Sequence, residues 1–200
     1  MKKLFFLTPI LFILACSEHQ IYFSGSVGIY PDRIFWAFIE NPPPDFGIVD
    51  DAKVILDSIY RIPYDGEKYG YYKEGIYSLT YDSIHTVQVE VKDKENIYGT
   101  AKIPSYFTIE IYSLGDSLYV EWTHADSLET QPDIWRVIIT QQQDTIYNRN
   151  RNREENTIMV YPIASFNEIE AIIEAIRYGD LSGAYGSSIF AGIVRRKKSL

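Results

Sequence analysis

Cysteine is nearly absent from this 200-residue sequence, which contains only Cys16. A single cysteine excludes an intramolecular disulfide, a Cys-x-x-Cys redox pair and a zinc site made of thiolates. Basic character is also lacking, because Asp and Glu outnumber Lys and Arg by 27 to 19 and the formal net charge is −8. This acidic balance argues against nucleic acid as a partner. The exception is the basic run Arg195–Lys198, which we expect to be a solvated tail.

The N-terminal apolar run, Leu4–Ala15, is too short to cross a membrane as a helix. It has twelve residues, whereas a spanning helix needs about 20. Lys2 and Lys3 precede the run, and polar residues follow it from Ser17 onward. A basic start, a short apolar segment and a small residue at its end are typical of a secretory signal peptide. We therefore expect residues 1–15 to be a cleaved leader.

The end of this run, Ile13-Leu14-Ala15-Cys16, resembles the lipobox of bacterial lipoproteins. The resemblance implies that Cys16 carries diacylglycerol, and that residues 16–20 form a lipidated tether. Each buried methylene contributes about 0.8 kcal/mol, so several acyl chains would hold the protein on a membrane. The resemblance implies a lipid-anchored protein of the cell envelope, and we expect the membrane to be the outer membrane, on its periplasmic or its surface face. An ordinary signal peptide that ends in a chance cysteine is the alternative.

The sequence is rich in aromatic residues, with 17 tyrosines and 10 phenylalanines, and 46% of its residues are hydrophobic. Such residues favour half-buried strands, so we predict an all-β fold. The clearest strand is His85–Lys92, where Val87 and its alternate neighbours share one face. Pro104 ends the strand that follows, and a new set of strands begins after it. We therefore predict two β-sandwich domains, residues 21–104 and 105–200.

The segment 166–177 carries two contradictory patterns. Ser165 and Glu168 form a capping box, and isoleucines follow at helical spacing, which predicts a helix. The same residues also alternate as a strand would, and the segment lies among predicted strands. We favour the strand.

Several patterns resemble immunoglobulin-like and fibronectin type III-like sandwiches, and a family of surface lipoproteins of unknown function that accompany outer-membrane receptors in gram-negative bacteria. They are Gly75–Leu79, Gly99–Pro104, Trp122, the glycine-rich turn Gly179–Gly186 and Phe190-Ala191-Gly192. The resemblance implies two sandwich domains, a strand over Ile172–Tyr178 and an outer-membrane receptor or other envelope protein as the partner.

No pattern of an enzyme is present in the sequence. His124 and Asp126 lie close to a serine, but no Gly-x-Ser-x-Gly turn accompanies them, so we expect no catalytic residues. We also predict no metal site and no cofactor. We expect Trp122 to lie in the core, because it shares a strand face with Leu118 and Val120.

The tyrosines of segment 61–75 are the candidate ligand contacts. Tyr69, Tyr71 and Tyr72 lie among glycines and lysines in what reads as a long loop, where exposed rings can stack on sugars or peptides. Packing of these rings on the sandwich is the alternative. The sequence as a whole predicts a non-enzymatic, lipid-anchored binding or assembly module. A hydrolase of envelope polymers with a site assembled from loops, or a structural spacer or adhesin, is the alternative.

Overall fold

The computed structural model describes residues 20–123, 131–161, 163, 165–186 and 188–200. These residues form 16 strands and no helix, so the predicted all-β fold is confirmed. None of them belongs to a helix long and apolar enough to cross a membrane. Cys16, His124 and Asp126 lie outside the described residues.

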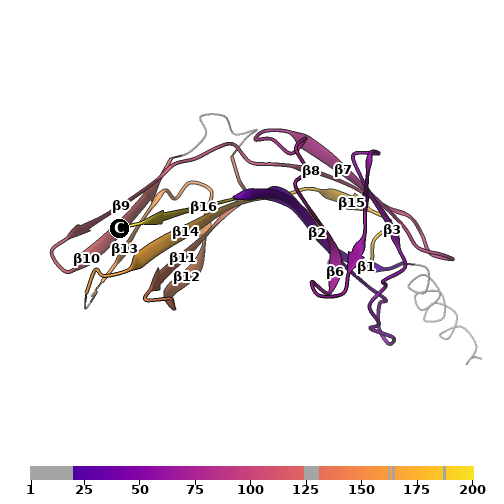
Figure 1. Cartoon of the computed structure of the whole chain (residues 1–200), viewed down its shortest axis with the longest axis horizontal. Helices are drawn as coiled ribbons and strands as arrows, with labels where there is room; N and C mark the ends of the chain where they lie inside the picture. The colour runs from indigo at the N-terminus through magenta and orange to yellow at the C-terminus, as the bar shows by residue number, and fades with distance from the viewer. Residues whose placement is uncertain (1–19, 124–130, 162, 164, 187) are drawn as a thin grey trace, which may run out of the picture.

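The largest element is an eight-stranded sheet that runs through the whole molecule (Figure 1). Its strands, in spatial order, are β12 (Asp144–Asn152), β11 (Ile134–Gln141), β14 (Ile169–Tyr178), β16 (Ile189–Ser199), β1 (Tyr22–Tyr30), β2 (Asp32–Glu40), β6 (Gly70–Glu74) and β5 (Tyr64–Asp65). β1 and β16 pair in parallel, and all other neighbours in this sheet are antiparallel. β16 thus joins the two halves of the sheet.

Two smaller sheets cover different halves of the long sheet, and the whole molecule is bowed (Figure 1). The five-stranded sheet contains β15 (Asp180–Ser182), β8 (Ile97–Lys102), β7 (Ile84–Glu90), β3 (Lys53–Leu56) and β4 (Tyr60–Ile62). The three-stranded sheet contains β13 (Thr157–Val160), β10 (Ser117–Trp122) and β9 (Ile109–Leu114). The layers are sandwich-like, with the core between each small sheet and the long one.

The predicted boundary at Pro104 falls in the connection between the two smaller sheets, but the long sheet does not divide there. β1 pairs with β16, and β8 pairs with β15, so strands from both predicted segments share two sheets. Gly192 of β16 allows the close approach of β8, since a Cβ on it would lie 2.0 Å from the Lys102 carbonyl oxygen. The two halves are therefore joined through paired strands, and are not separate domains connected by a linker.

The contested segment is a strand, as we favoured. Ile169, Ala171 and Ile173 are fully buried, and β14 pairs along its length with β11 and β16. The Ser165 side chain accepts a hydrogen bond from Gln141 at 2.9 Å and caps no helix. Pairing on both edges thus overrides the local helical pattern.

Trp122 lies in the core as predicted, with 3% of its surface exposed. Its ring lies 5.8 Å from that of Trp135 on the long sheet, so it links the two layers. The basic run was not predicted correctly. Arg195–Lys198 forms part of β16 and pairs with β14, so it is not a solvated tail.

Candidate functional site

The predicted loop 61–75 is mostly strand, because it contains β5, β6 and the end of β4. Tyr71 has only 1% of its surface exposed and belongs to the core. Its hydroxyl donates a hydrogen bond to the Val49 carbonyl at 3.0 Å and accepts one from the Ala52 amide at 2.7 Å. Burial raises the pKa of Tyr71 to about 12. Tyr71 therefore ties a loop to the sheet, and its predicted role as a ligand contact is wrong.

The other two candidate tyrosines, Tyr69 and Tyr72, do not share a surface with Tyr71. Tyr69 is 68% exposed, in a turn where its φ is 51°. The hydroxyl of Tyr72 donates a hydrogen bond to Glu74 at 3.0 Å, and the Lys68 ammonium lies 5.3 Å from its ring. Since neighbouring strand residues point to opposite faces, the three rings could not all meet one partner.

A chain of hydrogen bonds that the sequence analysis missed joins Asp57, His85 and Ser83. The Asp57 carboxylate lies 2.7 Å from His85 Nδ1, and the Ser83 hydroxyl lies 2.6 Å from His85 Nε2. The order acid, imidazole and hydroxyl is that of a hydrolase triad. One signal of this chain was visible in the sequence, because His85 alternates in step with Val87 and therefore shares the buried face of β7 with it.

The surroundings of this chain favour a structural role. His85 is only 3% exposed, and the Ser83 hydroxyl donates a hydrogen bond to the Thr80 carbonyl at 2.5 Å. A hydroxyl has one proton, so the hydrogen bond from Ser83 to the Thr80 carbonyl would have to break before His85 could accept that proton. The Asp57 carboxylate also accepts a hydrogen bond from the Thr86 amide at 2.9 Å. The chain thus fastens the turn after β3 to the start of β7.

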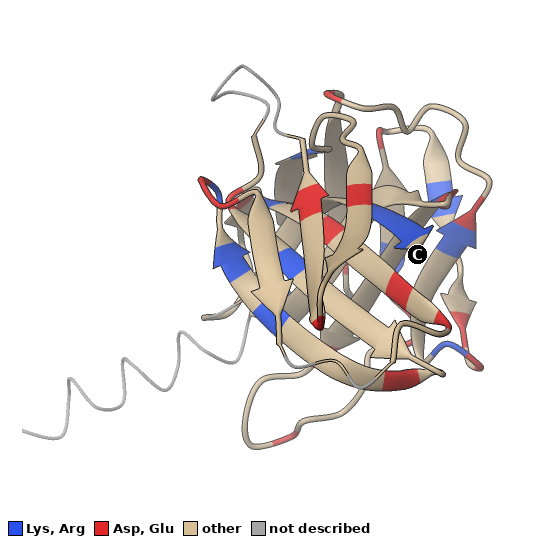
Figure 2. Cartoon of the chain, turned by 90° about the vertical axis from the view of Figure 1, so that its left-hand side faces the viewer, with Lys and Arg blue, Asp and Glu red and all other residues tan. Residues whose placement is uncertain are grey.

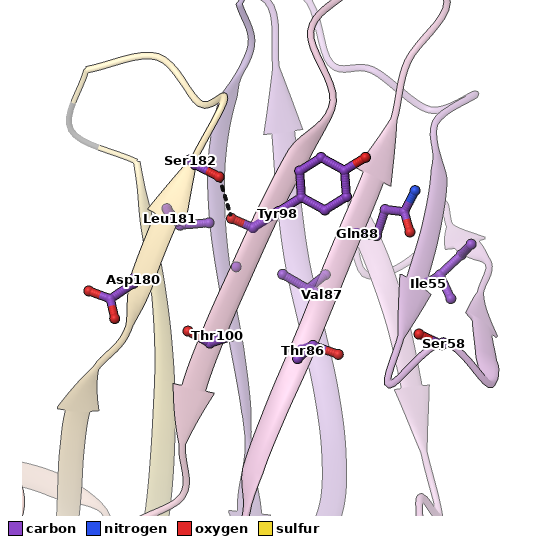
Figure 3. A pocket seen from close by; sticks show the side chains of 11 residues that line it. Ile55, Ser58, Thr86, Val87, Gln88, Tyr98, Thr100, Asp180, Leu181 and Ser182 are labelled. Atoms are coloured by element: carbon purple, nitrogen blue, oxygen red, sulfur yellow. Dashed lines mark hydrogen bonds between the residues drawn. The ribbon is translucent and has the colours of Figure 1, made fainter.

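A shallow hollow of about 380 Å³ lies on the outer face of the five-stranded sheet (Figure 3). Figure 3 shows side chains from four of its strands around this hollow, among them Thr86, Gln88, Thr100 and the half-exposed ring of Tyr98. Ser182 donates a hydrogen bond to the Tyr98 carbonyl at 3.4 Å. The hollow offers neutral polar groups on one open face, with no described charge other than Asp180.

The most complete arrangement lies beside the last residues of β16. β1 pairs with β16 only as far as Val194 and then turns at Pro31 into β2. Within the described chain, Arg195–Ser199 therefore pairs on one side only, with β14. β9, across from it, is likewise an edge strand that pairs only with β10 in that part of the chain. Two open strand edges thus face a common gap.

This gap is hollow, and we call it the edge groove. Along β9 a hollow of about 590 Å³ is lined by Thr108–Tyr112 and by Arg196–Lys198. Beside the end of β1, a second hollow of about 600 Å³ is lined by Tyr30, Tyr81 and Tyr106, by Glu170 and Ile172 of β14, and by Arg195–Lys197 of β16. The Tyr81 and Tyr106 rings form an edge-to-face pair with centroids 5.3 Å apart. Backbone groups and aromatic rings therefore line the same groove.

The charges of the edge groove divide by the faces of β16. On the outer face, Arg195 forms an ion pair with the buried Glu174, and Lys197 pairs with Glu170 at 3.1 Å. On the inner face, Arg196 donates to the Phe107 carbonyl at 2.9 Å and lies 4.1 Å from the Tyr106 ring centroid. Neither Arg196 nor Lys198 has an ion pair with a described carboxylate. Figure 2 shows the basic segments near the tip of this strand.

Tyr30, which lines the second hollow, borders the groove from the outer side. The Arg195 guanidinium lies 5.2 Å from the ring centroid of Tyr30, and burial raises the pKa of Tyr30 to about 12. The Arg195 guanidinium and the Tyr30 ring are therefore neighbours at the outer side of the groove. As for metals, the described residues contain no group of three His, Cys, Asp or Glu side chains able to hold an ion.

The fold defines an all-β protein of packed sheets, in which an open strand edge meets an aromatic groove. No protein-family model matches the sequence, and no curated protein matches it. Among solved structures, the chain is similar to the crystal structure of chicken CNTN1 FN1-FN3 domains, with a TM-score of 0.29 and 10% identity. The match covers 89% of this chain and 63% of that chain.

Proposed function

We propose that this chain is a non-enzymatic binding or assembly module of the cell envelope, held on the outer membrane by acyl chains on Cys16. Its partner is a membrane protein, such as an outer-membrane receptor, or another envelope protein. The observation that carries the proposal is the edge groove, which combines open backbone groups, tyrosines and two cations, Arg196 and Lys198, that form no ion pair with a carboxylate of the described residues. Tyrosine and arginine are the residues that most often anchor protein interfaces.

Photo-crosslinking in intact cells tests this function. A photoreactive phenylalanine analogue replaces Tyr106 in the groove, and in a second variant it replaces Tyr69 as a matched exposed tyrosine. We expect a discrete crosslink to one envelope protein from position 106 and none from position 69. Absence of a protein crosslink from position 106, or an equal one from position 69, would contradict the proposed site.

The membrane attachment is tested separately. Cys16→Ala should abolish metabolic labelling with a fatty acid and release the protein from the membrane fraction, because the sequence has no other thiol on which the thioether could form. Labelling that persists on this variant would show that the anchor has been assigned to the wrong residue.

A hydrolase of envelope polymers is the second candidate, and the hydrogen-bonded chain Asp57–His85–Ser83 is the observation that favours it. An active serine would react with a fluorophosphonate probe, and Ser83→Ala would abolish that reaction. We expect no labelling of the native protein, because the Ser83 proton is donated to Thr80 and His85 is buried. Labelling lost in Ser83→Ala would instead establish the hydrolase.

A further inference from the structure

We infer that the edge groove takes an extended peptide segment that pairs with Arg195–Ser199 of β16 as an added strand and carries acidic side chains at alternate positions. This inference rests on the proposed function and names the chemistry of the partner. The segment would belong to the partner protein.

The backbone geometry supports an added strand. β16 continues for five residues beyond its last pairing with β1, while Pro31 has no amide proton and turns the chain away into β2. The space beside Arg195–Ser199, which we call the lane, therefore continues the line of β1 along the edge of β16. Five extended residues span about 16 Å, and main-chain hydrogen bonds along such a lane are the usual source of affinity in strand addition.

The side chains of β16 specify which charges the segment carries. Arg195 and Lys197 on the outer face are already paired with Glu174 and Glu170. Arg196 and Lys198 on the inner face border the hollow along β9, and no described carboxylate pairs with either. Because cross-strand neighbours on one face meet directly, carboxylates two residues apart on the added strand would lie opposite these two cations.

The aromatic rings complete the lining of the lane. Tyr81 and Tyr106 support each other in an edge-to-face pair, and the Arg196 guanidinium covers the Tyr106 ring. These rings lose little conformational entropy on contact with an apolar or aromatic side chain of the segment. The groove is therefore already formed before the segment arrives.

Synthetic peptides test the inference on the full chain purified in detergent. The probe is an eight-residue peptide that alternates glutamate with valine, and a peptide that alternates lysine with valine is its control. We expect the glutamate peptide alone to bind, as measured by fluorescence anisotropy. Two further glutamate peptides carry N-methyl groups on one or the other set of alternate amides. Strand pairing predicts that methylation of only one of these two sets of amides abolishes binding, because alternate amides of a strand point to opposite edges and only one edge faces β16.

Variants of the protein locate the peptide. Lys198→Glu reverses an exposed charge in the groove, and Arg61→Glu makes the same change of charge on the remote edge strand β4. We expect Lys198→Glu to weaken binding of the glutamate peptide about tenfold or more, and Arg61→Glu to leave it unchanged. Equal effects of the two variants would reduce the interaction to net charge and overturn the inference.

The outcomes separate this inference from the proposed function. If position 106 crosslinks to an envelope protein but no peptide binds, or if both N-methylated peptides bind, the groove has a partner and the added strand is wrong. Binding by a soluble glycan or by a second copy of the chain at the groove, in place of the glutamate peptide, would also overturn the inference. If no crosslink forms in cells, the proposed function itself fails.

Discussion

Tyr71 shows how one residue can be aromatic, polar and structural at once. Its hydroxyl donates a hydrogen bond to the buried Val49 carbonyl and accepts one from the partly buried Ala52 amide. Tyr71→Phe should therefore lower the free energy of unfolding by about 1–3 kcal/mol, because both partners lose their hydrogen bond. Denaturant melts of the two proteins at pH 7 measure this difference.

The pH dependence of this contribution follows from the raised pKa. Tyr71 has a pKa of about 12 in the folded protein, against 10.0 ordinarily, because burial disfavours the charged form. The neutral hydroxyl thus contributes fully below pH 10, and the contribution is lost as the pH rises from 10 to 12. The stability gap between native protein and Tyr71→Phe should narrow over that range. A gap that narrows below pH 9 would assign the effect to another group.

Trp122 is the residue whose burial the sequence predicted correctly, and it tests the contact between layers. Trp122→Ala should cost about 3–5 kcal/mol, because a large cavity would open beside Trp135. Trp122→Phe should cost much less, because the indole Nε1 is buried with no described hydrogen-bond partner and the substitution removes that unpaired donor. Equal costs for the two variants would show that the ring volume does not support the core.

At the scale of the element, local sequence patterns predicted a strand well where one face of the strand is buried. They were ambiguous where pairing with distant strands determines the conformation. The alternation of Val87 and Val89 gave β7, since both are buried on one face. The capping box at Ser165 pointed the other way, and only the pairing of β14 on both edges resolves it. The free edge of Arg195–Ser199 could not be predicted, because it depends on where β1 stops, 165 residues earlier in the chain. The chain Asp57–His85–Ser83 could not be predicted either, because Asp57 and His85 are 28 residues apart in the sequence and meet only through the pairing of β3 with β7.

Gly192 tests the close contact between β16 and the five-stranded sheet. A Cβ at this position would lie 2.0 Å from the Lys102 carbonyl oxygen, which is backbone and cannot swing aside. Gly192→Ala should therefore destabilise the protein by about 2 kcal/mol or more. Gly66→Ala is the matched control, because nothing lies within 4 Å of the added methyl. A harmless Gly192→Ala, in thermal melts of both variants, would mean that the sheets are farther apart.

At the scale of the whole molecule, the shared sheet predicts one unfolding unit. β1 and β8 belong to residues 21–104, and they pair with β16 and β15 from residues 105–200. The two segments therefore share sheets. We expect one calorimetric transition whose enthalpy equals the van't Hoff enthalpy. Residues 20–104 alone should not fold, because they lack both C-terminal strands. Two separate transitions, or a folded 20–104 fragment, would show that the halves are independent domains.

The open edge of β16 is the feature on which the functional account depends, and amide hydrogen exchange observes it directly. In the free chain, amides of Arg195–Ser199 that point away from β14 should exchange quickly. With the glutamate–valine peptide present, these amides should slow at least tenfold, while β12, an edge strand elsewhere in the same sheet, keeps its rates. Unchanged exchange in Arg195–Ser199 at saturating peptide, or protection confined to the outer face of the five-stranded sheet, would contradict the account.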